Sequence, residues 1–193
     1  MSEAGPRIYV RVPLERIGVL VGEKGEVLKM LERELGVKIV VDSANGTVVI
    51  EPAAPGVSPF KLMKAKDFVT AIALGFSPER AERLLSDDQV LVVIDLKEEV
   101  GDSPNHLRRV KGRIIGEKGK ARKNLEEMTG TYISIYGDKV AIIGDYESAE
   151  VARQAIMMLI EGRQHSTVYR YLERELRKLK KHRLTDLWLR DVK

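Results

Sequence analysis

The tetrapeptide Gly-Glu-Lys-Gly occurs twice in this chain of 193 residues, and the two copies are 94 positions apart. They are Gly22, Glu23, Lys24 and Gly25, and Gly116, Glu117, Lys118 and Gly119. Each copy lies between a short apolar run and an amphipathic helix pattern. Glycine has no Cβ atom, so such a turn lets the backbone approach a sugar-phosphate chain, and helix-start amides can face the phosphates. One such turn is an ordinary helix–helix connection, but a matched pair predicts two nucleic-acid clamps.

The same order of elements is expected around both turns. Apolar periodicity and turn residues predict the first half as a strand at 7–12, helices at 14–21 and 26–35, strands at 37–41 and 47–50, and a helix at 60–74. The second half is predicted as a strand at 90–96, a polar insertion at 97–103, helices at 106–115 and 120–128, strands at 131–136 and 140–143, and a helix at 148–160. The shift of 94 residues also aligns Glu32 with Glu126 and Ile39 with Ile133. The sequence therefore predicts an α+β fold with two similar domains in β-α-α-β-β-α order.

The predicted domain limits follow from this repeat. The first domain is expected at 7–75, a helical bridge at 76–89, the second domain at 90–162, and a basic C-terminal helix with its tail at 163–193. Ser77 and Pro78 are typical of a helix start, which supports the helical bridge. The stretch 167–183 combines an apolar stripe with many cations, which predicts an amphipathic helix.

The net charge of +4 is unevenly distributed along the chain. Between Arg108 and Lys123 there are eight lysines or arginines and a single acid, Glu117. Around the first turn, at 14–29, three cations are balanced by three acids. The second turn is therefore expected to provide more of the affinity for phosphates.

Several classes of protein are disfavoured by the sequence. The chain has no cysteine, which suits a reducing compartment, and the cytoplasm is expected. A run of about 18 apolar residues and a signal-peptide core are both missing, so neither a membrane span nor secretion is expected. The second turn does not follow the pattern of a nucleotide-binding P-loop, because Ala121 stands where serine or threonine is required. The histidines His106, His165 and His182 have no metal-ligand spacing. We predict no catalytic residue, no metal and no cofactor.

The tandem glycine turns, each followed by an apolar helix and a β-branched strand, resemble the KH RNA-binding family, and the element order resembles the type I KH fold. The segments 71–81 and 112–120 look like archaeal KH proteins related to the eukaryotic Pno/Dim pre-rRNA-processing factors. This resemblance covers about residues 8–179. It implies binding of single-stranded rRNA near the 3′ end of the small-subunit rRNA during ribosome maturation. It also implies an endonuclease or a translation initiation factor as a possible partner.

A KH groove accommodates about four nucleotides. At the second turn, Lys118 is expected to neutralise a phosphate. Other cations are expected to extend the positive surface, namely Arg113, Lys120, Arg122 and Lys123. The resemblance adds an apolar floor beneath the bases, with Ile114, Ile115, Ile133 and Ile135 as candidates. Each isoleucine fits a place in the core equally well. Tyr132 and Tyr136 alternate with the strand isoleucines and fit packing or stacking on a base.

Two alternatives stay open. The nearly neutral first turn fits a supporting or protein-binding role as well as RNA binding. The basic C-terminal helix fits contact with RNA, contact with an acidic protein, or simple solvation. The competing function is a protein-interaction scaffold in which RNA contact is incidental.

Overall fold

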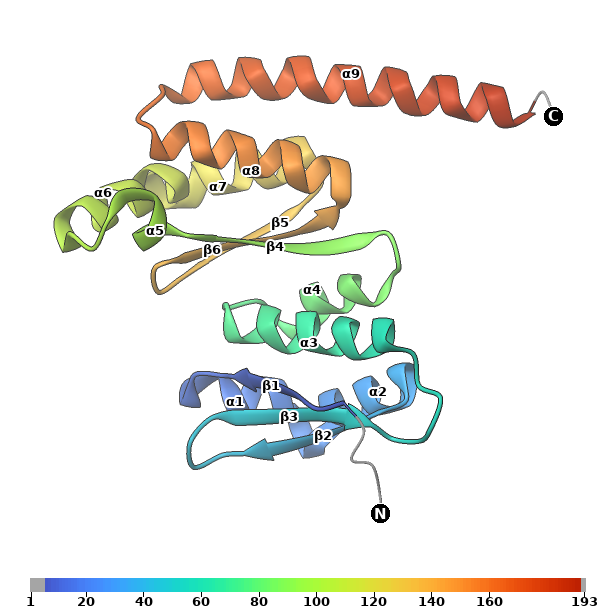
Figure 1. Cartoon of the computed structure of the whole chain (residues 1–193). Coiled ribbons are helices and arrows are strands. Elements are labelled where there is room, and N and C mark those ends of the chain that lie inside the picture. Colours follow the sequence, from blue (N-terminus) through green and yellow to red (C-terminus); the bar gives the residue numbers. More distant parts are fainter. Residues whose placement is uncertain (1–5, 192–193) are drawn as a thin grey trace. The chain divides into compact units, whose positions relative to one another are not determined.

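A computed structural model describes residues 6–191, with side chains described up to residue 188. The chain divides into two compact units, Met1–Leu91 and Val92–Lys193 (Figure 1). Each unit contains one three-stranded sheet, with strand order β1-β3-β2 in the first and β4-β6-β5 in the second. The predicted α+β class is confirmed.

The first unit follows the predicted order. Its elements are β1 (Ile8–Arg11), α1 (Leu14–Val21), the short helix η1 (Glu23–Gly25), α2 (Glu26–Leu35), β2 (Val37–Asp42), β3 (Thr47–Pro52), α3 (Pro59–Ala73), α4 (Pro78–Ala81) and η2 (Glu82–Leu85). The strands pair antiparallel, with Ile50 of β3 opposite Ile8 and Ile39. Ile39 and Ile50 are buried, whereas their neighbours Lys38 and Val40 are exposed. This alternation gives the sheet one apolar face that packs against the helices.

The segment expected as a helical bridge is helical and packs against α3 within the first unit. Ala81 and Leu84 are fully buried there. Lys64 of α3 is also buried, and its Nζ donates hydrogen bonds to the carbonyls of Ser86 at 2.7 Å and Gln89 at 2.9 Å. These bonds satisfy the buried ammonium and attach the segment to α3.

The second unit repeats the plan and adds two helices. Its elements are β4 (Gln89–Asp95), α5 (Leu96–Val100), α6 (Pro104–Ile115), the short helix η3 (Glu117–Gly119), α7 (Lys120–Thr129), β5 (Tyr132–Tyr136), β6 (Lys139–Asp145), α8 (Tyr146–Ile160) and α9 (His165–Asp191). The polar insertion predicted at 97–103 contains the short helix α5. Asp95 caps this helix by accepting a hydrogen bond from the Lys97 amide at 3.0 Å, and Leu96 is fully buried.

The C-terminal helix α9 is longer than the predicted 167–183, because no proline or glycine interrupts the chain between His165 and Asp191. Its inner face packs against α7 and α8 and includes the fully buried Val168 and Leu172. Arg183 attaches its far part to the start of α8 through ion pairs with Asp145 at 2.6 Å and Glu147 at 3.0 Å. Residues 192–193 of the predicted tail and residues 1–5 lie outside the described part of the chain. Within residues 6–191, no helix has the length and apolar character required to cross a membrane.

Candidate nucleic-acid interface

The two Gly-Glu-Lys-Gly turns have the same backbone conformation. Gly22 and Gly116 have φ values of 75° and 73°, each with ψ at 176°. The lysines Lys24 and Lys118 have φ values of 51° and 50°, and the last glycines both have φ at 77°. The predicted repeat therefore extends to the dihedral angles of the turn, although most of the side chains around it differ.

The first and last glycines of each turn are required for different reasons. A Cβ atom on Gly22 would lie 2.4 Å from Cγ2 of Val27, and one on Gly116 would lie 2.5 Å from Cβ of Ala121. The first glycine therefore allows the turn to pack closely on the helix that follows. At Gly119 a Cβ atom would meet nothing within 4 Å. The last glycine is needed only for its positive φ, and the space in front of it is open to a ligand.

Lys24 and Lys118 are the only non-glycine residues with positive φ among residues 6–191. This left-handed conformation costs a lysine about 1–2 kcal/mol. Such strain persists only where the surrounding structure imposes it, and it is concentrated at ligand-binding sites. Both side chains are exposed, and Lys118 makes no ion pair with any residue that the structure describes. Lys118 is thus held at the tip of the turn with its ammonium available to an anion.

The helices that follow the turns differ in the charge at their start. Both α2 and α7 begin after a left-handed glycine, and neither has a side-chain cap. The amides of Glu26 and Lys120 donate to the carbonyls of Glu23 and Glu117 in the preceding short helices, so an anion at either helix start is attracted by the positive end of the helix dipole. In α2 the first residue is Glu26, whereas the corresponding residue of α7 is Lys120 and its first turn contains no acid. The start of α7 is consequently the stronger anion site.

Two of the cations near the second turn are bound within the protein. Nζ of Lys111 donates to the Gly137 carbonyl at 3.1 Å and to Asp138 Oδ1 at 3.0 Å. The hydrogen bond from Lys111 lowers the pKa of the Asp138 carboxyl below its usual range. This pairing removes Lys111 from the positive surface that the sequence suggested.

Arg113 also has a structural role, which corrects its assignment to the electrostatic surface. Its Nε donates to the Leu159 carbonyl at 3.1 Å, and its Nη2 donates to the Arg163 carbonyl. These carbonyls lie in and just beyond the last turn of α8, and the Leu159 carbonyl also accepts a hydrogen bond from the Gly162 amide at 3.1 Å, so Arg113 reinforces the end of this helix. In the first unit, Arg16 does the same for α3 through the carbonyls of Ile72 at 2.9 Å and Phe76 at 2.5 Å. No local pattern indicates this pairing of Arg113, because its acceptors lie 46 and 50 residues further along the chain.

Four predicted cations remain at the second turn, Lys118, Lys120, Arg122 and Lys123. Lys120 is exposed and has no ion pair among the described residues, and Lys123 makes only an exposed pair with Glu127 at 3.8 Å. Arg122 is half-buried, and its Nε is covered without a hydrogen-bond partner in the protein. Around the first turn, Glu23 and Glu26 are exposed beside Lys24.

A carboxylate connects the helix that follows each glycine turn to the edge strand of the same unit. Glu126 Oε1 accepts a hydrogen bond from the Ile133 amide at 2.7 Å, and Glu32 Oε1 accepts one from the Ile39 amide at 2.9 Å. The sequence repeat aligned Glu32 with Glu126 but did not reveal this role. The available signal was that both members of each pair align at the same offset of 94 residues.

The four isoleucines proposed as an apolar floor differ in how exposed they are. Ile114 is 0% exposed and Ile133 is 1% exposed, so both belong to the core and do not form an accessible floor in this conformation. Ile115 and Ile135 are half-buried and can contact a ligand. Tyr132 and Tyr136 are also half-buried. Among the residues described, no cluster of three or more histidine or acidic side chains could hold a metal ion.

Comparisons with known proteins identify the family. A KH domain model matches residues 7–70, and a model described as a eukaryotic type KH-domain, KH-domain type I, matches residues 90–177. A KH domain-containing protein of Methanocaldococcus jannaschii is 46% identical over 179 residues, which are 93% of this chain and 78% of that protein. The chain is a tandem KH-domain protein. The predicted type I KH fold is confirmed in both halves.

The KH match extends to eukaryotic and archaeal processing factors. The pre-rRNA-processing protein PNO1 of Yarrowia lipolytica is 29% identical over 167 residues, which are 84% of this chain and 64% of that protein. Among solved structures, a protein of unknown function from Aeropyrum pernix has a TM-score of 0.92 and 56% identity, covering 96% of this chain and 98% of that one. A chain from the a/eIF2α–aDim2p–rRNA complex of Pyrococcus horikoshii has a TM-score of 0.82 and 44% identity, covering 90% and 95%. The predicted relation to the Pno/Dim factors is confirmed.

Proposed function

We propose that this KH protein binds single-stranded rRNA, near the 3′ end of the small-subunit rRNA, during ribosome maturation. The second Gly-Glu-Lys-Gly turn is the principal contact with the phosphate backbone. The observation that carries this proposal is the position of Lys118, which is held in a left-handed conformation in front of a helix that begins with Lys120. Open space at Gly119 lets the RNA backbone lie against the protein main chain.

The relatives support the class of ligand and one class of partner. PNO1 proteins are named as pre-rRNA-processing or RNA-binding proteins, and the Pyrococcus horikoshii complex contains aDim2p, rRNA and a/eIF2α. A translation initiation factor is therefore one proposed partner. A ribosome-maturation endonuclease is the other, and it rests on the family resemblance. The protein would hold RNA for such a factor and perform no catalysis itself.

The lining of the second groove follows from exposure and charge. Lys118, Lys120, Arg122 and Lys123 provide the positive surface, and Ile115 and Ile135 provide accessible apolar contacts. Arg113, Ile114 and Ile133 support this site from within the protein. The first turn, with Gly22, Glu23, Lys24 and Gly25, has the same backbone but acts as a weaker RNA site, because the helix after it begins with Glu26 where the second has Lys120.

The test is a paired substitution in each turn. Glu117→Asp with Lys118→Asp removes the cation while keeping a residue type that tolerates the left-handed conformation. We expect the affinity for single-stranded RNA to fall at least about tenfold, with the circular dichroism spectrum and melting temperature nearly unchanged. The matched variant, Glu23→Asp with Lys24→Asp, should change affinity by less than about threefold.

Other results would revise the proposal in defined ways. If the two variants lose the same RNA affinity, the second turn is not the principal RNA contact. If neither variant affects RNA binding while partner binding is retained, the protein-interaction scaffold becomes the better description.

A further inference from the structure

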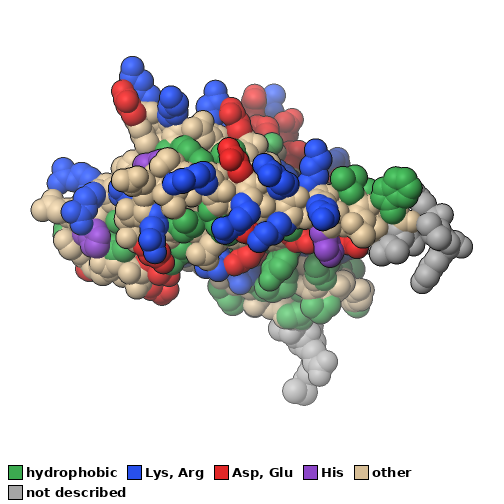
Figure 2. Space-filling view, turned by 90° about the horizontal axis from the view of Figure 1, so that it is seen from above, with side chains coloured by type: hydrophobic (Ala, Val, Ile, Leu, Met, Phe, Trp, Pro, Cys, Tyr) green, Lys and Arg blue, Asp and Glu red, His purple; other side chains and the backbone are tan. Residues whose placement is uncertain are grey.

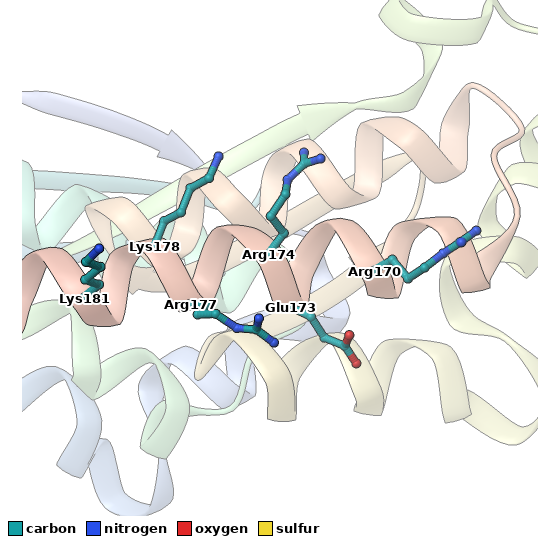
Figure 3. Close-up of a pocket in the computed structure, with 6 residues that line it drawn as sticks. All are labelled: Arg170, Glu173, Arg174, Arg177, Lys178 and Lys181. Atoms are coloured by element: carbon teal, nitrogen blue, oxygen red, sulfur yellow. The ribbon is translucent and has the colours of Figure 1, made fainter.

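The outer face of α9 carries a row of cations. It consists of Arg170, Arg174, Arg177, Lys178 and Lys181, and we call it the α9 ridge. All five side chains are exposed, and together with Glu173 they line a shallow groove along the helix (Figure 3). The spacing of three and four residues places them on the side of the helix opposite the buried Val168 and Leu172. Figure 2, which shows the molecule from above, has many Lys and Arg side chains on this face.

Internal ion pairs neutralise only part of the α9 ridge. Arg174 and Lys178 share one carboxylate, that of Glu175, at 2.8 Å and 3.0 Å. Arg170, Arg177 and Lys181 make no ion pair with any residue from 6 to 191 for which side chains are described. These three span about 16 Å along the helix axis at about 1.5 Å per residue. The ridge is therefore a linear array of cations with little internal compensation.

The start of α9 lies beside the second KH turn. His165 Nε2 is 2.8 Å from the carbonyl of Arg113, in the last turn of α6 just before Gly116. One turn further along α9, the Tyr169 hydroxyl accepts a hydrogen bond of 3.4 Å from Nδ2 of Asn124 on α7. The helices that flank the turn thus contact the beginning of α9, and Arg170 directly follows this contact. An RNA strand leaving the groove has a positively charged path along the helix.

We propose that the α9 ridge is a second binding site for the RNA backbone, which lengthens the RNA segment held by the second KH domain. This inference rests on the proposed function. Between Arg170 and Lys181 the outer face has no exposed aromatic or aliphatic side chain, and the exposed Leu184, Leu187 and Trp188 lie further along α9. Protein interfaces take most of their affinity from such apolar anchors, which the ridge itself lacks. Regularly spaced cations on a helix match the regularly spaced phosphates of a flexible single strand.

The test compares two RNA lengths. Fluorescence anisotropy would measure binding of oligonucleotides of about six and about sixteen nucleotides with a common core, since the KH groove alone holds about four. In the full-length protein, the triple variant Arg170→Glu, Arg177→Glu, Lys181→Glu should weaken binding of the longer RNA at least about tenfold. The shorter RNA should bind within about twofold of wild type, and the salt dependence for the longer RNA should become shallower by about 2 in log–log slope.

A matched control distinguishes an effect of the α9 ridge itself from an effect of the protein's net charge. The triple variant Arg7→Glu, Arg33→Glu, Lys38→Glu makes the same change in net charge at exposed side chains of the first unit. It should reduce binding of the longer RNA less than about threefold. Circular dichroism of both variants would verify that the helices are retained.

Three outcomes would overturn the inference. The first is that both triple variants lose the same affinity for the longer RNA, and the second is that the α9 variant loses the same affinity for both RNA lengths. The third is that the α9 variant keeps its affinity for the longer RNA but no longer binds a polyglutamate peptide. The last result would assign the ridge to an acidic protein segment. Failure of the wild-type protein to bind the shorter RNA would instead refute the proposed function itself, so the two failures are distinguishable.

Discussion

The two glycine turns of this KH protein have nearly the same backbone and different electrostatic surroundings. In the first, helix α2 begins with Glu26 and carries Leu28, whereas in the second, α7 has Lys120 and Arg122 at the equivalent positions. The comparison separates what the fold requires from what a ligand requires. The fold needs the glycines and the close approach of turn to helix, and both units retain them. The cations Lys120 and Arg122 are present in only one unit, which supports the proposal that they bind the ligand.

The lysine at the tip of the turn is a cation that both units retain. Both Lys24 and Lys118 keep the strained left-handed conformation, although only the second is surrounded by further cations. Strain of this kind is maintained by the flanking glycines and does not depend on the local charge. The first turn is therefore preorganised like the second, and its weaker predicted affinity follows from Glu26 and Leu28, which stand where the second unit has Lys120 and Arg122.

The largest expected effect is on stability and tests the requirement of the fold. Gly116→Ala and Gly22→Ala should each lower the free energy of unfolding by about 2–3 kcal/mol, because the new Cβ meets Ala121 or Val27 and the backbone is in a region that only glycine occupies readily. Urea denaturation would measure this loss.

The last glycine of each turn supplies the control for that experiment. Gly119→Ala and Gly25→Ala add only backbone strain of about 1–2 kcal/mol, since no close contact surrounds either position. Losses at Gly119 as large as those at Gly116 would contradict the packing explanation.

An exchange of charge between the turns should have the next largest effect. Lys120→Glu with Arg122→Leu gives the second turn the residue types of the first and should weaken RNA binding about tenfold, with the salt slope shallower by about 1.4. The reciprocal change, Glu26→Lys with Leu28→Arg, should strengthen binding at the first turn. Anisotropy titrations at several salt concentrations would measure both. If the reciprocal variant gains no RNA affinity, charge alone does not distinguish the two sites.

The smallest expected effect concerns the carboxylates that hold the edge strands. Glu126→Gln and Glu32→Gln keep an acceptor for the amides of Ile133 and Ile39 but remove its charge. Each should lower the free energy of unfolding by about 1 kcal/mol, because charge-assisted hydrogen bonds are stronger than neutral ones. Thermal denaturation would measure the two losses, which should be similar. A loss confined to one unit would mean that the two carboxylates are not equivalent.

Much of the fold could be predicted from the sequence, because local signals and the tertiary structure agree. The helices Leu14–Val21 and Glu26–Leu35 were predicted with the bounds that the structure has, since Pro13, the glycine turn and Gly36 delimit them. Because the sequence repeats, the same order of elements was predicted for the second unit. The helix α9 was underestimated at both ends, because the prediction followed one apolar stripe from Val168 to Leu179, whereas the apolar residues of the last turns, Leu184, Leu187 and Trp188, are exposed.

The candidate site was less predictable where the role of a residue depends on a partner far away in the sequence. Arg113 is one of eight cations between positions 108 and 123, and nothing local distinguishes it from Lys120. Only the tertiary structure shows that its guanidinium donates to carbonyls at the end of α8. Likewise, alternation predicted which strand isoleucines share a face, but burial alone separated the core residue Ile133 from the half-buried Ile135.

We claim that RNA phosphates contact the main chain of the second turn in preference to the first. A titration of the ¹⁵N-labelled protein with a short single-stranded RNA, followed by amide chemical shifts, tests it directly. The amides of residues 116–120 should shift at the lowest RNA concentrations, and those of residues 22–26 should shift only at higher concentrations. Shifts that appear first at residues 22–26, or at neither turn, would contradict the claim.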